Sequence, residues 1–151
     1  SRSYSTEAIL AEHYAPASTP ATLSGTGHSL PDGFSAYRNK QYADAARLFE
    51  AVAADDPHYA EAILFAGYAY YESKQYAKAV AAFERVASME DARFAANAQW
   101  HLVLAQAAEN PESERTKAAL RRIQQDAGHP YNRAAIDLER KLNSPFRMFG
   151  G

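Results

Sequence analysis

The histidines are the residues of this chain best suited to metal binding or acid–base chemistry. There are five of them: His13, His28, His58, His101 and His129. None belongs to an HExxH motif, and no two stand four residues apart, the spacing that places two imidazoles on one helix face. His58 and Glu61 could hold a metal together, but no third ligand is evident. We therefore interpret them as an exposed pair at the start of a helix, and His101 as a packed or half-exposed helix residue.

Other reaction chemistries have little support in the sequence. The chain has no Cys, which excludes disulfides, thiolate catalysis and Cys-based metal sites. The stretch SGTGHS at residues 24–29 has only two glycines and follows no strand, so it is not a phosphate-binding loop. Residues 112–122 mix acidic and basic side chains, and the net charge is -2, so nothing favours nucleic acid. We predict no enzymatic activity, no cofactor, no bound metal and no nucleic-acid partner.

The composition predicts a folded domain. The chain has 151 residues, of which 47% are hydrophobic and 23% are charged, enough to build a core. No apolar run approaches the length needed to cross a bilayer, so we expect no direct membrane insertion of this segment.

One segment of the sequence is repeated after 34 residues. NKQYADAARLFEAVA, residues 39–53, returns as SKQYAKAVAAFERVA, residues 73–87. The apolar positions within each copy follow a period of 3.6 residues, which predicts one buried helix face. Self-similarity at a fixed period is typical of a repeat protein.

The flanking segments also read as helices. Asp56 and Pro57 can begin a helix that runs to about residue 73. Gly67 is unfavourable inside this helix unless a neighbour approaches closely, and we expect Ala79 to be that neighbour. Strand patterns are absent. The predicted helices cover about residues 7–14, 31–38, 42–54, 57–73, 76–88, 92–108, 111–126 and 130–142.

The repeated unit resembles the tetratricopeptide repeat. In the second unit the resemblance rests on Ala66, Gly67, Tyr70, Tyr76, Ala79 and Phe83, and in the first on Gly33, Tyr42, Ala45, Phe49 and Pro57. It implies an all-α fold: a TPR-like α-solenoid of about three helical hairpins plus a C-terminal capping helix. Residues 1–28 would then form an irregular N-terminal arm, residues 29–143 the helical repeat domain and residues 144–151 a flexible tail.

The ends of the chain carry a second resemblance. AILAEHYAP and AGHPYNRAAIDLERKLN are similar to tetratricopeptide segments of Bacteroidetes-type bacterial membrane-associated proteins. This resemblance implies a bacterial, membrane-associated and periplasmic location.

An additional apolar stripe marks the first helix of each hairpin. In the resembled family these positions line the concave face, which implies a partner-binding groove. Its members are Phe34, Tyr37, Leu64, Tyr68, Tyr71, Trp100 and Leu104. Aromatic residues of this kind suit a peptide groove. They would equally suit packing against a neighbouring repeat or beneath residues 1–28.

Two functions follow from these alternatives. The first is a non-catalytic protein–protein interaction scaffold that binds a peptide or partner protein in the concave groove. The second is a structural or oligomerisation module, including a homo-oligomer, whose groove is filled by its own arm or by another subunit. The arm offers four apolar side chains for such a cover: Tyr4, Ile9, Leu10 and Tyr14.

Overall fold

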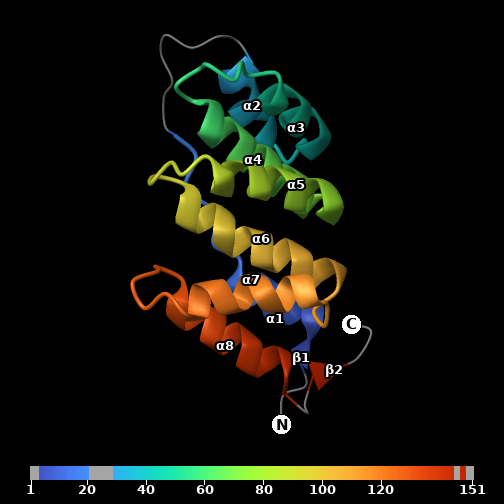
Figure 1. The fold of residues 1–151 in the computed structure, drawn as a ribbon. Helices are drawn as coiled ribbons and strands as arrows, with labels where there is room; N and C mark the ends of the chain where they lie inside the picture. Colours follow the sequence, from blue (N-terminus) through green and yellow to red (C-terminus); the bar gives the residue numbers. More distant parts are fainter. Residues whose placement is uncertain (1–3, 21–28, 145–146, 149–151) are drawn as a thin grey trace.

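The computed structural model describes residues 4–20, 29–144 and 147–148. Its elements, in chain order, are β1 (Tyr4–Ser5), α1 (Thr6–His13), α2 (Ser29–Arg38), α3 (Tyr42–Glu50), α4 (Tyr59–Glu72), α5 (Tyr76–Ser88), α6 (Ala95–Glu109), α7 (Glu114–Gln124), α8 (Asn132–Leu142) and β2 (Arg147–Met148). The hairpins α2–α3, α4–α5 and α6–α7 stack in order, and α8 closes the end of the stack (Figure 1). The fold is therefore the predicted all-α, TPR-like solenoid with a capping helix.

Most predicted helix bounds lie close to the observed ones, and α5 is reproduced to the residue. The largest differences are α3, which ends at Glu50 and not near residue 54, and α6 and α7, which each begin three residues later than predicted. The prediction that the chain has no strands was wrong, because β1 and β2 form a two-residue parallel pair. Of the predicted tail, residues 145–146 and 149–151 lie outside the described residues, as do residues 1–3 and 21–28 of the predicted arm and the side chain of Tyr4.

The 34-residue repeat extends to the backbone of the turns. Lys40 and Lys74, each at the end of the first helix of a hairpin, have positive φ angles of 59° and 61°. The next residue closes a six-residue turn in both copies, from Gln41 N–H to Ala36 C=O and from Gln75 N–H to Tyr70 C=O. With the inner bonds from the two lysine N–H groups, this is the Schellman arrangement that ends a helix.

Because the left-handed conformation is unfavourable for a residue with a Cβ atom, Lys40→Gly should stabilise the protein. We expect the free energy of unfolding to rise by about 0.5–1 kcal/mol, measured by chemical denaturation. The matched control is Ala81→Gly at an exposed site inside α5. It should lower the same quantity by about 1 kcal/mol. An equal loss in the free energy of unfolding from both substitutions would contradict the left-handed conformation of Lys40.

The two helices of each hairpin meet at a glycine and a phenylalanine. A Cβ atom added to Gly67 would lie 2.5 Å from the ring of Phe83, and one added to Gly33 would lie 2.8 Å from the ring of Phe49. The expected partner of Gly67, Ala79, is also buried, but it is the Phe83 ring that fills the space. The repeated glycines therefore let the phenylalanine rings lie directly on the backbone of the first helix.

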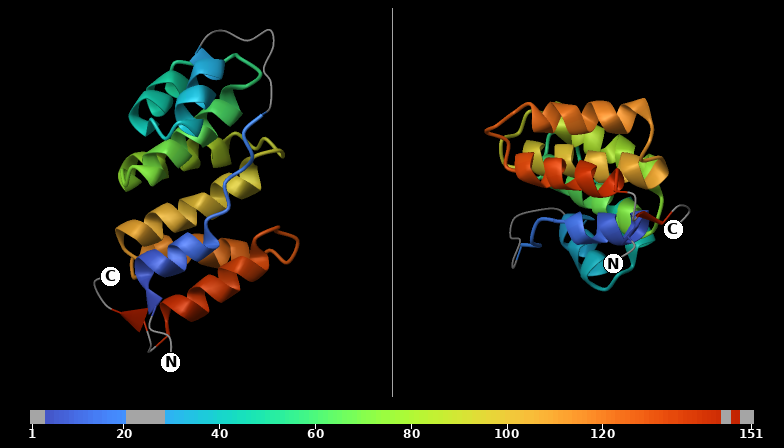
Figure 2. Two further views of the ribbon diagram at one scale, coloured as in Figure 1. Left: turned by 180° about the vertical axis from the view of Figure 1, so that it is seen from behind. Right: turned by 90° about the horizontal axis from the view of Figure 1, so that it is seen from below.

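The arm packs along the stack and is not separate from it. Helix α1 contacts α6 and α8, where Ile9 and Leu10 are buried. After α1 the chain crosses α6 and runs towards the α2 end of the molecule (Figure 2, left). The arm thus lies across the first helices of successive hairpins. No helix in the described part of the chain is both long and apolar enough to cross a membrane.

Candidate peptide-binding site

The seven residues of the predicted groove divide into three groups. Phe34 and Leu64 are buried in the core of the first two hairpins, and the Phe34 ring packs at 4.9 Å from those of both Phe49 and Phe65. Trp100 and Leu104 are buried in a second core cluster that includes α1. The remaining three, Tyr37, Tyr68 and Tyr71, lie close to one another and to Tyr14 of the arm.

An aromatic slot on α4 and α6 holds the ring of Tyr14. The Tyr14 ring stacks on Tyr71 with centroids 5.0 Å apart and an interplanar angle of 13°. It meets Tyr68 edge-on at 6.3 Å and His101 edge-on at 5.4 Å. Edge-to-face and offset stacked contacts of this kind each add about 0.5–1.5 kcal/mol beyond area burial. The slot is therefore shaped for a flat ring.

Four side chains of the same face bind the main chain of the arm. Trp100 Nε1 donates to the carbonyl of His13 at 2.9 Å, and Asn97 Nδ2 donates to the carbonyl of Ala15 at 3.0 Å. The N–H of Ala15 donates to His101 Nε2 at 3.2 Å, and the N–H of Ala17 donates to the Tyr68 hydroxyl at 3.0 Å. The arm is extended here, since Tyr14 has φ -69° and ψ 125°. This face therefore forms hydrogen bonds with both N–H and C=O groups of an extended main chain.

Contacts among these side chains fix the direction of each bond. His101 Nδ1 lies 2.8 Å from the carbonyl of Asn97 and must donate to it, which leaves Nε2 as the acceptor for the arm. The Tyr68 hydroxyl donates to Asn97 Oδ1, which leaves its oxygen free to accept. The second Nδ2 proton of Asn97 goes to the Tyr131 hydroxyl at 2.8 Å. His101, Tyr68 and Asn97 are therefore held in the orientation that an extended segment requires, and the indole N–H of Trp100 can only donate.

Burial lowers the pKa of His101 to about 4, from an ordinary value of 6.5. The ring is consequently neutral at pH 7, as its acceptor role demands. Above pH 6.5 the ring is neutral in both the folded and the unfolded chain, so its contribution to stability is full. As the pH falls from 6.5 to about 4, only the unfolded chain takes up the proton, and stability is lost.

We expect this histidine to lower the free energy of unfolding by about 3 kcal/mol between neutral pH and pH 4. The measurement is chemical denaturation at a series of pH values, compared with His101→Gln, which is neutral throughout. The other histidines are shared by both proteins, so the difference between them isolates His101. Parallel pH profiles for the two proteins would contradict the assignment.

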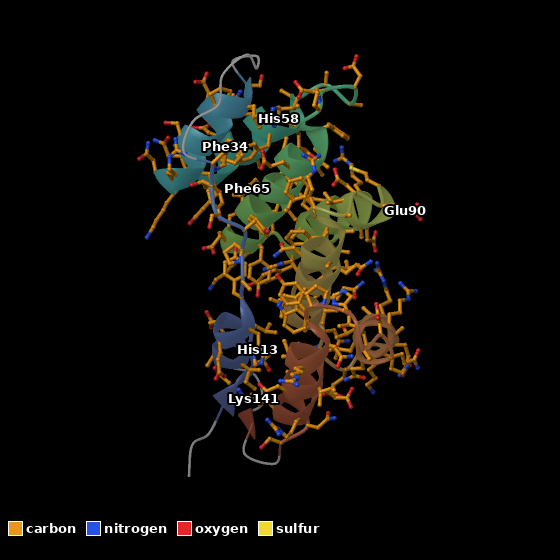
Figure 3. The ribbon with its side chains drawn as sticks, turned by 90° about the vertical axis from the view of Figure 1, so that its left-hand side faces the viewer. His13, Phe34, His58, Phe65, Glu90 and Lys141 are labelled. Carbon is orange, nitrogen blue, oxygen red and sulfur yellow. The ribbon has the colours of Figure 1, made fainter. Side chains whose placement is uncertain are left out.

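Helix α1, at the other end of the arm, is bonded to α8. His13 of α1 and Lys141 of α8, both labelled in Figure 3, each contact Asp137. His13 Nε2 lies 2.9 Å from Asp137 Oδ2, and Lys141 Nζ bridges Asp137 at 3.0 Å and Glu12 at 2.9 Å. The bond from Lys141, followed by those from His13 and Arg140, lowers the pKa of Asp137 to about 2. Asp137 therefore stays ionised, and its contribution is lost only as the pH falls from about 3.8 towards 2.

The arm leaves part of the face open. A hollow of about 420 Å³ lies beside Tyr14 and Tyr71, and its wall includes Glu72, Lys74 and Tyr76 as well as residues of α1. The hydroxyl of Tyr14 is buried and makes no well-aligned hydrogen bond. Burial, followed by the nearby Tyr37 hydroxyl and Glu72 carboxylate, raises the pKa of Tyr14.

Sequence reasoning did not single out Asn97. His101 was expected to be packed or half-exposed; it is packed, at 0% exposure, but its hydrogen bond to the arm was not predicted. Both lie on the helix face of Trp100 and Leu104, at spacings of three and four residues, and this spacing could have found them. No group of three or more potential metal ligands occurs among the described residues. His58 lies 3.7 Å from Glu61, as a pair at the start of α4.

Comparison with known proteins bears on the repeats. Residues 36–107 match the family model described as Tetratricopeptide repeat. The match runs from the end of α2 into α6 and includes both copies of the 34-residue pattern. No curated protein matches the chain. Residues 36–107 are therefore similar to tetratricopeptide repeats.

Proposed function

We propose that this protein is a non-catalytic protein-interaction module whose concave face binds an extended peptide segment. The observation that carries the proposal is the set of four side chains that bond the main chain of residues 13–17. Tetratricopeptide repeats generally mediate protein–protein interaction, which supports the same function. In the present structure the arm occupies the face as an internal ligand.

Two features favour an arm that a partner can displace. Ala15 and Pro16 are exposed, so their side chains add little to docking. The buried Tyr14 hydroxyl makes no well-aligned hydrogen bond, although the Tyr37 hydroxyl and the Glu72 carboxylate lie near it, so it adds little to docking. A partner segment with a better-paired group at this position would offset part of the advantage that covalent attachment gives the arm.

The alternative is a structural or oligomerisation module. The complete burial of Ile9 and the 4% exposure of Leu10 favour an arm that stays docked. The same contacts could be made by the arm of a second copy, which would yield a homo-oligomer by exchange of identical elements. The predicted association with a bacterial membrane stays a prediction.

The test keeps the arm and the helical repeats together in one preparation. A protease site is placed within residues 21–28, and the arm carries a fluorophore at Ser18, which is exposed. After cleavage the arm fragment remains held only by its contacts. We expect an excess of unlabelled peptide with the sequence of residues 4–20 to release the fragment, followed as a fall in fluorescence anisotropy.

The control peptide has the same composition in scrambled order and should release nothing. If the cleaved fragment remains bound under a large excess of the matching peptide, the arm is a permanent part of the fold. That result would favour the structural module over the peptide-binding module.

A further inference from the structure

We propose that the concave face selects extended four-residue segments in which the first residue is aromatic, the second and fourth are not proline, and the third position accepts proline. This inference rests on the proposed function and names the class of peptide that the same face would take. The internal example is Tyr14-Ala15-Pro16-Ala17.

The first position is set by the slot. Tyr71 offers a flat surface to the incoming ring, while Tyr68 and His101 close its sides with their edges or faces. The slot has contact surface for a planar side chain, and an aliphatic side chain would lose the stacked contact. The hydroxyl of Tyr14 makes no well-aligned hydrogen bond, although Tyr37 and Glu72 lie near it, so Phe should be accepted about as well as Tyr.

The second and fourth positions are set by their N–H groups. The N–H of Ala15 is bound by His101, and that of Ala17 is bound by the Tyr68 hydroxyl. Proline has no N–H, so at the second position it would leave His101 Nε2 without a donor, and at the fourth it would remove the hydrogen bond that the Tyr68 hydroxyl accepts. Because these contacts are to the main chain, many different side chains are compatible with the second position, where Ala15 is exposed.

The third position is the place where proline is tolerated. Among the described residues no hydrogen bond to the main chain of Pro16 is formed, and its ring is exposed. Proline holds its own φ near that of an extended chain and disfavours the helical conformation of the preceding residue. Pro16 therefore holds the main chain of Ala15 in the extended conformation in which Asn97 and His101 bind it.

The test uses the cleaved protein described above and a series of competitor peptides based on residues 4–20. The quantity compared is the peptide concentration that releases half of the labelled arm fragment. We expect Tyr14→Ala to raise it by at least about tenfold, and Ala15→Pro and Ala17→Pro by about tenfold each. Tyr14→Phe should leave it unchanged or lower it, and Pro16→Ala should raise it by less than about threefold.

Thr19→Pro is the matched control, because it introduces proline outside residues 13–17, whose main chain carries the four hydrogen bonds. It should change the half-release concentration little. If the unchanged peptide competes but Ala15→Pro and Ala17→Pro compete equally well, the selectivity proposed here is overturned while the binding face stands. The same holds if Tyr14→Ala competes fully. If the unchanged peptide itself does not compete, the proposed function fails, and this inference with it.

Discussion

Replacing Phe83 by Ala is expected to lower the free energy of unfolding by about 3–5 kcal/mol. The Phe83 side chain is completely buried and lies on Gly67 of the facing helix, and its ring also meets Tyr68 at 5.8 Å and His101 at 5.7 Å. Removing the ring leaves a cavity between α4, α5 and α6. Denaturation in urea or guanidinium gives the change directly.

A double-mutant cycle with Gly67→Ala tests the cause. In the unchanged protein, the added methyl group collides with the Phe83 ring and should cost about 1–3 kcal/mol. In the Phe83→Ala background the space is vacant, and the better helix propensity of Ala should make Gly67→Ala neutral or stabilising. Additive effects of the two changes would contradict the close contact between the glycine and the ring.

Replacing Trp100 by Ala should have an effect of similar size and should also loosen the arm. The Trp100 ring is fully buried and stacks on Tyr131 with centroids 5.5 Å apart and an interplanar angle of 3°. Its Nε1 atom donates to the carbonyl of His13. We expect a loss of about 3–5 kcal/mol in the free energy of unfolding, measured by denaturation.

The control for this change is Trp100→Phe, which retains an aromatic ring but cannot donate a hydrogen bond. It should retain much of the stability and still accelerate dissociation of the arm fragment from the cleaved protein. If Trp100→Ala destabilises the protein but leaves the dissociation rate of the fragment unchanged, the indole contributes to the core alone.

The helical repeats could be predicted because their signals are local. The apolar spacing of α5 and its copy in α3 needs only neighbouring residues, and Phe49, Phe83, Ala45, Ala79 and Gly67 are all buried as predicted. The partner of Gly67 could not be predicted in the same way. Ala79 and Phe83 lie on one stripe of α5, and only the crossing point of the two helices decides which of them meets the glycine.

Part of the face that contacts the arm could be predicted. Helical spacing places Tyr68 and Tyr71 of α4 and Trp100 of α6 among the predicted groove residues, and all three contact the arm. Their bonds to the arm join residues 51 to 87 positions apart, and no local pattern encodes such contacts. The two-residue pairing of β1 with β2, at the two ends of the chain, escaped prediction for the same reason.

The measurement that tests the central claim most directly is hydrogen exchange at the indole N–H of Trp100, the single tryptophan of the chain. In the cleaved protein the arm fragment should protect this proton, because it is bonded to the His13 carbonyl. Removing the fragment should abolish the protection, and adding the peptide of residues 4–20 should restore it, while amide protons of α5 stay protected throughout. Unchanged indole exchange in all three states, or a failure of the peptide to restore protection, would contradict a concave face that binds extended peptides.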